Sequence, residues 1–98
     1  MITEHALLQV TSGREAEFVE SMEQAKAIIA ASHGFVSLRV ERCVERPSCF
    51  LLLVEWERLE DHTEGFRGSA GYQDWRAALH HFYEPFPVVE HFVTVVTA

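Results

Sequence analysis

The stretch Cys49 to Trp56, apolar except for Glu55, limits the folds that this chain can adopt. Its sequence, CFLLLVEW, has the length and the leucine, valine and aromatic content of a buried β-strand. The following residues, 58–82, carry most of the aromatic and titratable side chains of the chain. Because a buried strand needs cover on its faces, we expect this segment to pack on the strand and to form the wall of any binding site.

The length and charge of the chain restrict its class. Ninety-eight residues suit one domain, 1–98, and a domain of this size buries roughly 65% of the surface that its unfolded chain exposes. The formal net charge of −7, with one lysine and seven scattered arginines, argues against nucleic acid and against an anionic membrane as partners. No apolar run approaches the ~20 residues that span a bilayer. The N-terminus lacks the pattern of a signal peptide, so we expect a cytoplasmic protein.

Two periodicities predict the first part of the chain. Residues 2–10 alternate between apolar and mixed positions, which predicts a strand with one fully apolar face. Ser12 and Glu15 fit a capping box, so a helix is expected over residues 14–31. We expect His33 and Gly34 to end this helix, because glycine tolerates a left-handed C-terminal cap. Its apolar side chains recur at helical spacing, and they are Phe18, Met22, Ala25 and Ile29.

The sequence pattern of the second part of the chain predicts a hairpin, a broken helix and a last strand. Residues 35–44 form the second strand, and a turn at residues 45–48 returns the chain into the strand Cys49 to Trp56. A short helix follows, then a kink at Gly65 and Gly68, then a longer helix capped by Ser69. Residues 88–96 form the last strand. The side chains expected to share the apolar face of the second strand are Val36, Leu38, Val40 and Val44; those of the helices are Leu59, His62, Phe66, Tyr72, Trp75, Leu79 and Phe82.

The resulting β-α-β-β-α-β order predicts an α+β, ferredoxin-like fold, in which two helices cover one face of a four-stranded antiparallel sheet. The other face of the sheet remains uncovered. Its side chains include His5, Leu7 and Gln9, which are too apolar for open water and too polar for a dry core. A face of this composition suits a partner sheet, a ligand or both.

Four motifs carry a resemblance to a known family. They are TSGREAEF at residues 11–18, His33-Gly34-Phe35, LLLVEW at residues 51–56, and the series His62-x3-Phe66-x2-Ser69-x2-Tyr72. In order and spacing they are similar to the antibiotic biosynthesis monooxygenase superfamily, the dimeric α/β-barrel proteins. The resemblance covers nearly the whole chain, and Glu55-Trp56 followed by the helical segment is its most specific part. It implies a homodimer whose sheets pack face to face, with a cavity in each protomer between sheet and helices.

The resemblance also implies an activity, a cofactor-independent monooxygenase that uses O2 on a small aromatic or quinol-type substrate. Such chemistry needs a base, a cation or donor to hold the substrate anion, and a dry apolar pocket. It requires no metal, flavin or other cofactor. The alternative is a non-catalytic, small-ligand-binding or stress-associated dimer with the same fold, because a fold does not fix a reaction.

A third branch of the family degrades haem and is disfavoured here. It relies on an asparagine on the first strand, a tryptophan on the second helical segment and a haem-ligating histidine. The corresponding positions are His5, Phe66 and Arg76, and all three differ. An arginine cannot replace the neutral imidazole that ligates haem iron. His80 or His81 would serve only after a shift of the helix register.

His62, Tyr72 and Arg76 are the candidate catalytic residues. His62 is the side chain best suited to exchange protons at neutral pH, and its structural alternative is a histidine hydrogen-bonded to the backbone. Tyr72 offers a hydroxyl to a ligand. Arg76 binds an anionic ligand or, alternatively, pairs with Asp74 or with Glu residues at the surface. The candidate substrate-binding residues, of which the aromatic ones equally suit a simple core, are His5, Phe66, Trp75 and His91.

Cysteine and histidine spacing indicates neither a disulfide framework nor a metal site. Cys43 and Cys49 flank the predicted hairpin turn, and a cytosolic compartment would keep both reduced, although a disulfide across the hairpin is the alternative. No H-E-x-x-H or C-x-x-C element is present. The adjacent His80 and His81 diverge by about 100° on a helix and do not share a metal easily.

Overall fold

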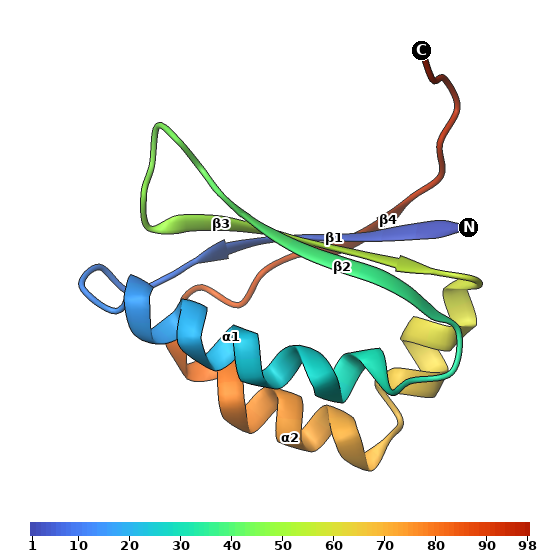
Figure 1. Cartoon of the computed structure of the whole chain (residues 1–98), viewed down its shortest axis with the longest axis horizontal. Coiled ribbons are helices and arrows are strands. Elements are labelled where there is room, and N and C mark those ends of the chain that lie inside the picture. The colour runs from blue at the N-terminus through green and yellow to red at the C-terminus, as the bar shows by residue number, and fades with distance from the viewer.

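A computed structural model describes all 98 residues, which form a four-stranded antiparallel sheet with helices on one face (Figure 1). The order of strands across the sheet is β2-β3-β1-β4. The predicted α+β, ferredoxin-like architecture is therefore confirmed. The elements are β1 (Ile2–Gln9), α1 (Glu15–Ala30), β2 (Phe35–Arg42), β3 (Cys49–Trp56), η1 (Asp61–Phe66), α2 (Ala70–Leu79), η2 (His80–Phe82) and β4 (Val89–Phe92).

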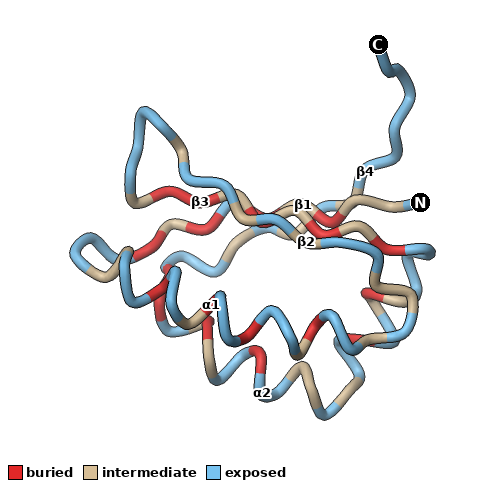
Figure 2. The backbone as a smooth tube through the Cα atoms, in the orientation of Figure 1, coloured by how far each residue is buried: buried red, intermediate tan, exposed pale blue.

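The hydrophobic core lies between the sheet and the helices, and Figure 2 shows buried positions both on the strands and on the helices. β3 occupies the range predicted for it, and it pairs with β2 on one side and β1 on the other. Its alternate side chains Phe50, Leu52, Val54 and Trp56 are buried against the helices. The intervening side chains face the open side of the sheet and are half-buried in the single chain.

The start of α1 differs from the predicted capping box. Arg14 occupies the N-cap position without a side-chain hydrogen bond, so the prediction for Ser12 is wrong. Glu15 instead accepts a hydrogen bond from the backbone N–H of Gly13 at 2.9 Å, and it also accepts one from the hydroxyl of Ser48. The four predicted core residues of the helix are buried, and the helix ends at Ala30, before the Gly34 that takes a φ of +81° in the turn into β2.

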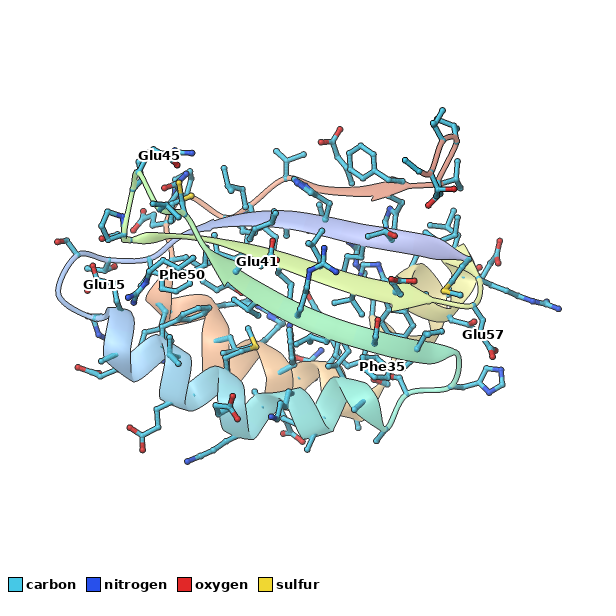
Figure 3. All side chains as sticks on the ribbon, turned by 45° about the horizontal axis from the view of Figure 1, so that its top comes forward. Glu15, Phe35, Glu41, Glu45, Phe50 and Glu57 are labelled. Atoms are coloured by element: carbon cyan, nitrogen blue, oxygen red, sulfur yellow. The ribbon has the colours of Figure 1, made fainter.

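The hairpin of β2 and β3 forms, but two of its predicted core valines are exposed. The pairing register shifts between Phe35 and Ser37, and this irregularity leaves Val36 42% exposed. β2 ends at Arg42, so Val44 lies in the turn and is 89% exposed. In Figure 3, Phe35 and Glu45 mark the two ends of this strand and turn. The prediction that Val36 and Val44 belong to the buried face is wrong. Cys43 and Cys49 are both free cysteines.

The segment from η1 to η2, here called the helical arm, contains the predicted break. The hydroxyl of Ser69 accepts a hydrogen bond from the backbone N–H of Tyr72 at 3.2 Å, which confirms the predicted cap of α2. At Gly68 a Cβ atom would lie 2.6 Å from the carbonyl oxygen of Glu64, so the close turn before Ser69 requires glycine. Leu59 is 38% exposed, contrary to its predicted place on the buried face. None of the helices is long and apolar enough to cross a membrane.

The last strand is shorter than predicted. β4 spans only Val89–Phe92 and pairs with Thr3–Ala6 of β1. Because β1 itself begins at Ile2, residues after Phe92 have almost no strand left to pair with. Val93, Val95 and Val96 are between 61% and 86% exposed, and the chain leaves the sheet at this point (Figure 1).

Candidate functional site

A cavity of about 370 Å³ lies between the sheet and the helical arm. The sheet contributes small and aliphatic side chains such as Ala6 and Leu52, and nine of the 14 lining residues are hydrophobic. The aromatic lining comes from the arm and the segment after it, and consists of Phe66, Tyr72, Trp75, Tyr83 and Phe86. An apolar cavity of this size with a few polar groups is typical of a small-molecule site.

Glu4 places a buried carboxyl group in this cavity. Glu4 is 5% exposed and lies on β1, where it pairs with Val54 of β3 and His91 of β4. Oε1 accepts a hydrogen bond from Nε1 of Trp56 at 3.0 Å and lies 3.3 Å from Nε2 of His62. Burial raises the pKa of Glu4 to about 7, although the Trp56 hydrogen bond and the charge of Arg67 oppose the rise. At neutral pH this carboxyl group therefore exchanges a proton readily.

His62 is brought to Glu4 by the π-helical turn of η1. The backbone N–H of Arg67 donates to the carbonyl of His62 at 3.1 Å, five residues apart, and such wide turns are frequent at functional sites. The ring of His62 is stacked on the indole of Trp56, with ring centres 5.4 Å apart. Its Nδ1 shares a hydrogen bond of 2.8 Å with Nε2 of His91. Both ring nitrogens of His62 are thus engaged.

Burial favours the neutral forms of both Glu4 and His62. It lowers the pKa of His62 to about 3, with smaller contributions from the nearby Arg67 and His91. Between about pH 3 and pH 7 the pair therefore consists of a carboxylic acid and a neutral imidazole, and above pH 7 Glu4 becomes a carboxylate. A buried carboxyl that ionises near neutral pH beside a neutral histidine is an arrangement typical of acid–base chemistry.

Arg67 supplies the positive charge of the cavity. It follows η1 directly, its residue is exposed, and its side chain lines the cavity. Its charge lowers the pKa of Glu4, His62 and His91. An arginine in this place can hold a developing anion on a ligand.

Two further titratable side chains, His80 and Tyr83, line the cavity. Burial, and then the charge of Arg76, lower the pKa of His80, whereas burial raises the pKa of the Tyr83 hydroxyl. At neutral pH His80 is therefore an uncharged imidazole and Tyr83 a potential hydrogen-bond donor.

The structure brings four of the predicted site residues together and leaves three outside the cavity. His62, Phe66, Tyr72 and Trp75 line it. The three that do not line it are His5, Arg76 and His91. Of these, His91 reaches the site indirectly, because it contacts His62.

Arg76 and His5 point away from the cavity for different reasons. Arg76 follows the buried Trp75 by one residue, which turns it about 100° around α2, and it lies in a separate shallow hollow with His81. It forms no ion pair, so the alternative pairing with Asp74 is absent. His5 precedes Ala6 on β1 and therefore faces the open side of the sheet, where its ring packs edge-on against Phe92 at 5.3 Å.

Glu4 and Arg67 are site residues that the sequence prediction missed. A signal for Glu4 was present, because it shares the alternation of Ala6 and Leu8 and so places a charge on the apolar face of a strand. Arg67 had no comparable signal, since its direction depends on the π-helical turn and the kink that follows it.

Two other places in the protein are weaker candidates for a functional site than the cavity. A hollow of about 640 Å³ lies between α1 and β2 but contains no buried titratable group. His33, Glu57 and Asp61 place possible metal ligands within 4.8 Å of one another, away from the cavity. His33 and Glu57 are exposed, and Asp61 already accepts a hydrogen bond from the backbone N–H of Arg58. Such exposed groups are common without an ion, so the cavity is the candidate site.

The fold and cavity define a class of small α+β proteins with a ferredoxin-like sheet and a partly open cavity between the sheet and the helices. The chain belongs to the antibiotic biosynthesis monooxygenase family, whose family model matches residues 1–78. It is 52% identical to YczJ, an uncharacterized protein of Bacillus subtilis (strain 168), over 97% of this chain and 100% of that one.

Solved structures agree with this assignment. A protein from Bordetella bronchiseptica, assigned provisionally as an antibiotic biosynthesis monooxygenase, is 33% identical and has a TM-score of 0.93, with 97% of each chain covered. SnoaB from Streptomyces nogalater, a cofactor-independent oxygenase, is 20% identical with a TM-score of 0.81, over 98% of this chain and 94% of that one. At this identity the likeness to SnoaB shows the fold alone.

Proposed function

We propose that the protein is a cofactor-independent monooxygenase that uses O2 to oxidise a small phenol or quinol inside the cavity. The observation that carries the proposal is the buried Glu4–His62 pair, which opens onto an aromatic cavity with a cation, Arg67, at its lining. These supply a base, an anion-holding group and an apolar compartment. The fold shared with SnoaB, named as a cofactor-independent oxygenase, supports the same class of reaction.

The reaction begins with a proton transfer. The carboxylate form of Glu4 accepts the proton of the substrate hydroxyl, and the guanidinium of Arg67 stabilises the resulting phenolate. Because burial raises the pKa of Glu4 to about 7, the carboxylate is a stronger base than an exposed glutamate and is still formed at neutral pH. The aromatic walls hold the planar ring and exclude water from the anion.

Oxygen then reacts with the electron-rich anion. One electron passes from the phenolate to O2, and the two radicals combine at a ring carbon to give a peroxide. The peroxide takes up one proton that comes from water, because the substrate proton has been removed by Glu4. Loss of the ring hydrogen as a proton and cleavage of the O–O bond release water and leave a quinone. One oxygen atom stays in the product and the other leaves in water. The substrate supplies all the electrons, so no external reductant is needed.

The first test measures quinone formation from hydroxynaphthalene-type substrates. We expect turnover in air and none without O2, and we expect Glu4→Gln to lower kcat on the order of 10²–10⁴-fold because it removes the base. Arg67→Gln should weaken turnover, whereas Arg46→Gln, in the exposed hairpin turn, serves as the matched loss of a cation. Full activity of Glu4→Gln would contradict the assignment of the base. A loss confined to Arg76→Gln would show that the cation is Arg76 rather than Arg67.

Binding measurements separate the proposed reaction from two alternatives, haem degradation and ligand binding without catalysis. We expect haemin to give no tight Soret complex, although the neutral His80 at the cavity makes this control necessary. A non-catalytic ligand-binding protein would bind the same phenols, measured by calorimetry, and return them unchanged after aerobic incubation. Binding without product from every phenol tested would therefore favour that alternative.

We also propose that the protein forms a homodimer through the open face of its sheet. Leu7 is 38% and Phe92 50% exposed on this face, and Leu53 lies beside His5 in the pairing register. Covering the face would remove apolar area from water, and a stable interface needs roughly 800 Å² from each partner.

Light scattering tests the dimer. We expect a mass of twice the 11.2 kDa of the chain, and we expect Leu53→Glu to shift the protein to the monomer because it would bury an unpaired charge. Val44→Glu adds the same charge in the exposed turn and should leave the dimer intact. A monomeric parent protein at micromolar concentration would contradict the proposal.

A further inference from the structure

We propose that Glu4, His62 and His91 form a proton relay that carries the proton taken from the substrate out of the cavity, with His91 as its outer end. The relay rests on the proposed role of Glu4 as the base. It goes further because it gives His91, which does not line the cavity, a defined role in the reaction.

The three side chains form an unbroken chain of contacts. Glu4 Oε1 lies 3.3 Å from His62 Nε2, and His62 Nδ1 lies 2.8 Å from His91 Nε2. Glu4 and His91 are also direct partners in the pairing of β1 with β4, so both lie on the cavity side of the sheet. His62 comes from η1 and bridges them.

The burial of the three groups gives the chain a direction. Glu4 and His62 are 5% and 3% exposed. His91 is only half-buried, on β4 at the edge of the sheet. The Glu4 residue is therefore largely shielded from solvent, whereas the His91 residue is more exposed. The contacts therefore run from a buried acid to the edge of the sheet.

The transfer moves one proton from Glu4 to water and leaves the charge of both histidines unchanged. The protonated carboxyl of Glu4 donates its proton to Nε2 of His62, while His62 gives the proton on Nδ1 to Nε2 of His91. His91 then releases its own Nδ1 proton to water. Glu4 is left as a carboxylate, ready for the next substrate, and both imidazoles are neutral in their other tautomers. The reverse transfer, from water through His91 and His62 to Glu4, restores the starting tautomers and brings in the one proton that the peroxide takes up, which leaves Glu4 again as a carboxylate.

The charges around the relay keep its two histidines from retaining an additional proton. The other titratable groups that line the cavity are Arg67 after η1, Tyr72 on α2, His80 in η2, and Tyr83 directly after the arm. Arg67 is the only permanent charge among them. Its charge lowers the pKa of both His62 and His91, so neither imidazole holds an additional proton for long at neutral pH.

A first experiment follows the tautomers of the histidines by side-chain ¹⁵N NMR of the whole protein between pH 5 and 9, without substrate. We expect the proton of His62 to move from Nδ1 to Nε2 as Glu4 ionises, and we expect one fixed tautomer over the whole range in Glu4→Gln. A His62 that keeps the same tautomer while Glu4 titrates would overturn the relay. This result does not depend on turnover, so it decides the relay even if no quinone is formed.

A second experiment uses turnover. We expect His91→Gln to lower kcat about tenfold in dilute buffer, and added imidazole to restore it, because a small base replaces the missing end of the relay. His81 is an exposed histidine outside the cavity, so His81→Gln should leave kcat unchanged both with and without imidazole. Unchanged turnover in His91→Gln, or a loss that imidazole does not restore, would show that His91 has only a structural role. Absence of turnover in the parent protein would instead count against the proposed function.

Discussion

Glu4→Gln and His62→Gln will change the stability of the protein in opposite directions as the pH rises. In the native structure the two side chains touch, and burial opposes the charged form of each. One is an acid and the other a base, so the same burial gives pH dependences of opposite sign. In the parent protein these trends offset each other between about pH 4.5 and 6.5. Each substitution removes one of them and exposes the other.

The contribution of Glu4 is greatest at low pH. Its pKa is raised from 4.5 to about 7 in the folded protein, so the folded state binds this proton more tightly than the unfolded chain. The stabilisation is fully present below pH 4.5 and is lost as the pH rises to about 7. Over this window the stability of Glu4→Gln should therefore increase relative to the parent protein, by at most about 3 kcal/mol.

The contribution of His62 has the opposite sign. Its pKa is lowered from 6.5 to about 3, so the folded state holds the neutral ring and the unfolded chain binds the proton. The stabilisation is present above pH 6.5 and is lost as the pH falls toward 3. The stability of His62→Gln should therefore decrease relative to the parent protein as the pH rises through this window, by at most about 5 kcal/mol.

Denaturant unfolding of the three proteins at intervals between pH 3 and 8 measures both effects. Val44→Ala, at an exposed position without a titratable group, is the control, and its stability difference should not vary with pH. Parallel curves for Glu4→Gln and His62→Gln would contradict the assigned ionisation states of the pair.

Replacement of Trp56 will affect both stability and the acidity of Glu4. Trp56 is fully buried, its ring contacts Phe35, His62 and Phe66, and its Nε1 donates to Glu4. Trp56→Ala should cost about 3–5 kcal/mol because it removes the largest buried side chain and leaves a cavity. Trp56→Phe keeps much of the packing but loses the donor. Since that hydrogen bond lowers the pKa of Glu4, its loss should raise the pKa above 7.

Carboxyl ¹³C NMR of Glu4 and denaturant unfolding test these two variants. Trp75→Phe is the matched control, because Trp75 is a buried indole of the same cavity that makes no hydrogen bond to Glu4. It should lower stability without moving the titration of Glu4. An unchanged Glu4 titration in Trp56→Phe would show that the indole does not hold the carboxyl group.

The elements that the sequence predicted well are those fixed by local patterns. The strand Cys49–Trp56 matched its prediction because a run of apolar β-formers of this length is typical of a central strand. The cap at Ser69 was predictable because a serine hydroxyl bonds a backbone N–H three residues away. The errors at Val36, Val44 and the end of β4 concern pairing, in which a strand depends on the length and register of its neighbour.

The residues of the candidate site also fall into those that local sequence patterns predicted and those that depend on contacts between distant segments. The aromatic residues Phe66, Tyr72 and Trp75 were predictable as one cavity wall, because their spacing places them on one side of the arm. The partners of Glu4 were not, since Trp56 and His62 lie 52 and 58 residues further along the chain. The choice of Arg67 over Arg76 depended on a π-helical turn that local spacing does not reveal.

The amino-acid sequence by itself determined the order of the elements, the central strand and the aromatic face of the helical arm, because periodicity, capping and turn chemistry act over a few residues. Only the tertiary structure decided which charges face the cavity and how they ionise. Burial and contacts between distant segments set the pKa of Glu4 and His62, and both arise when η1 folds over β1 and β4.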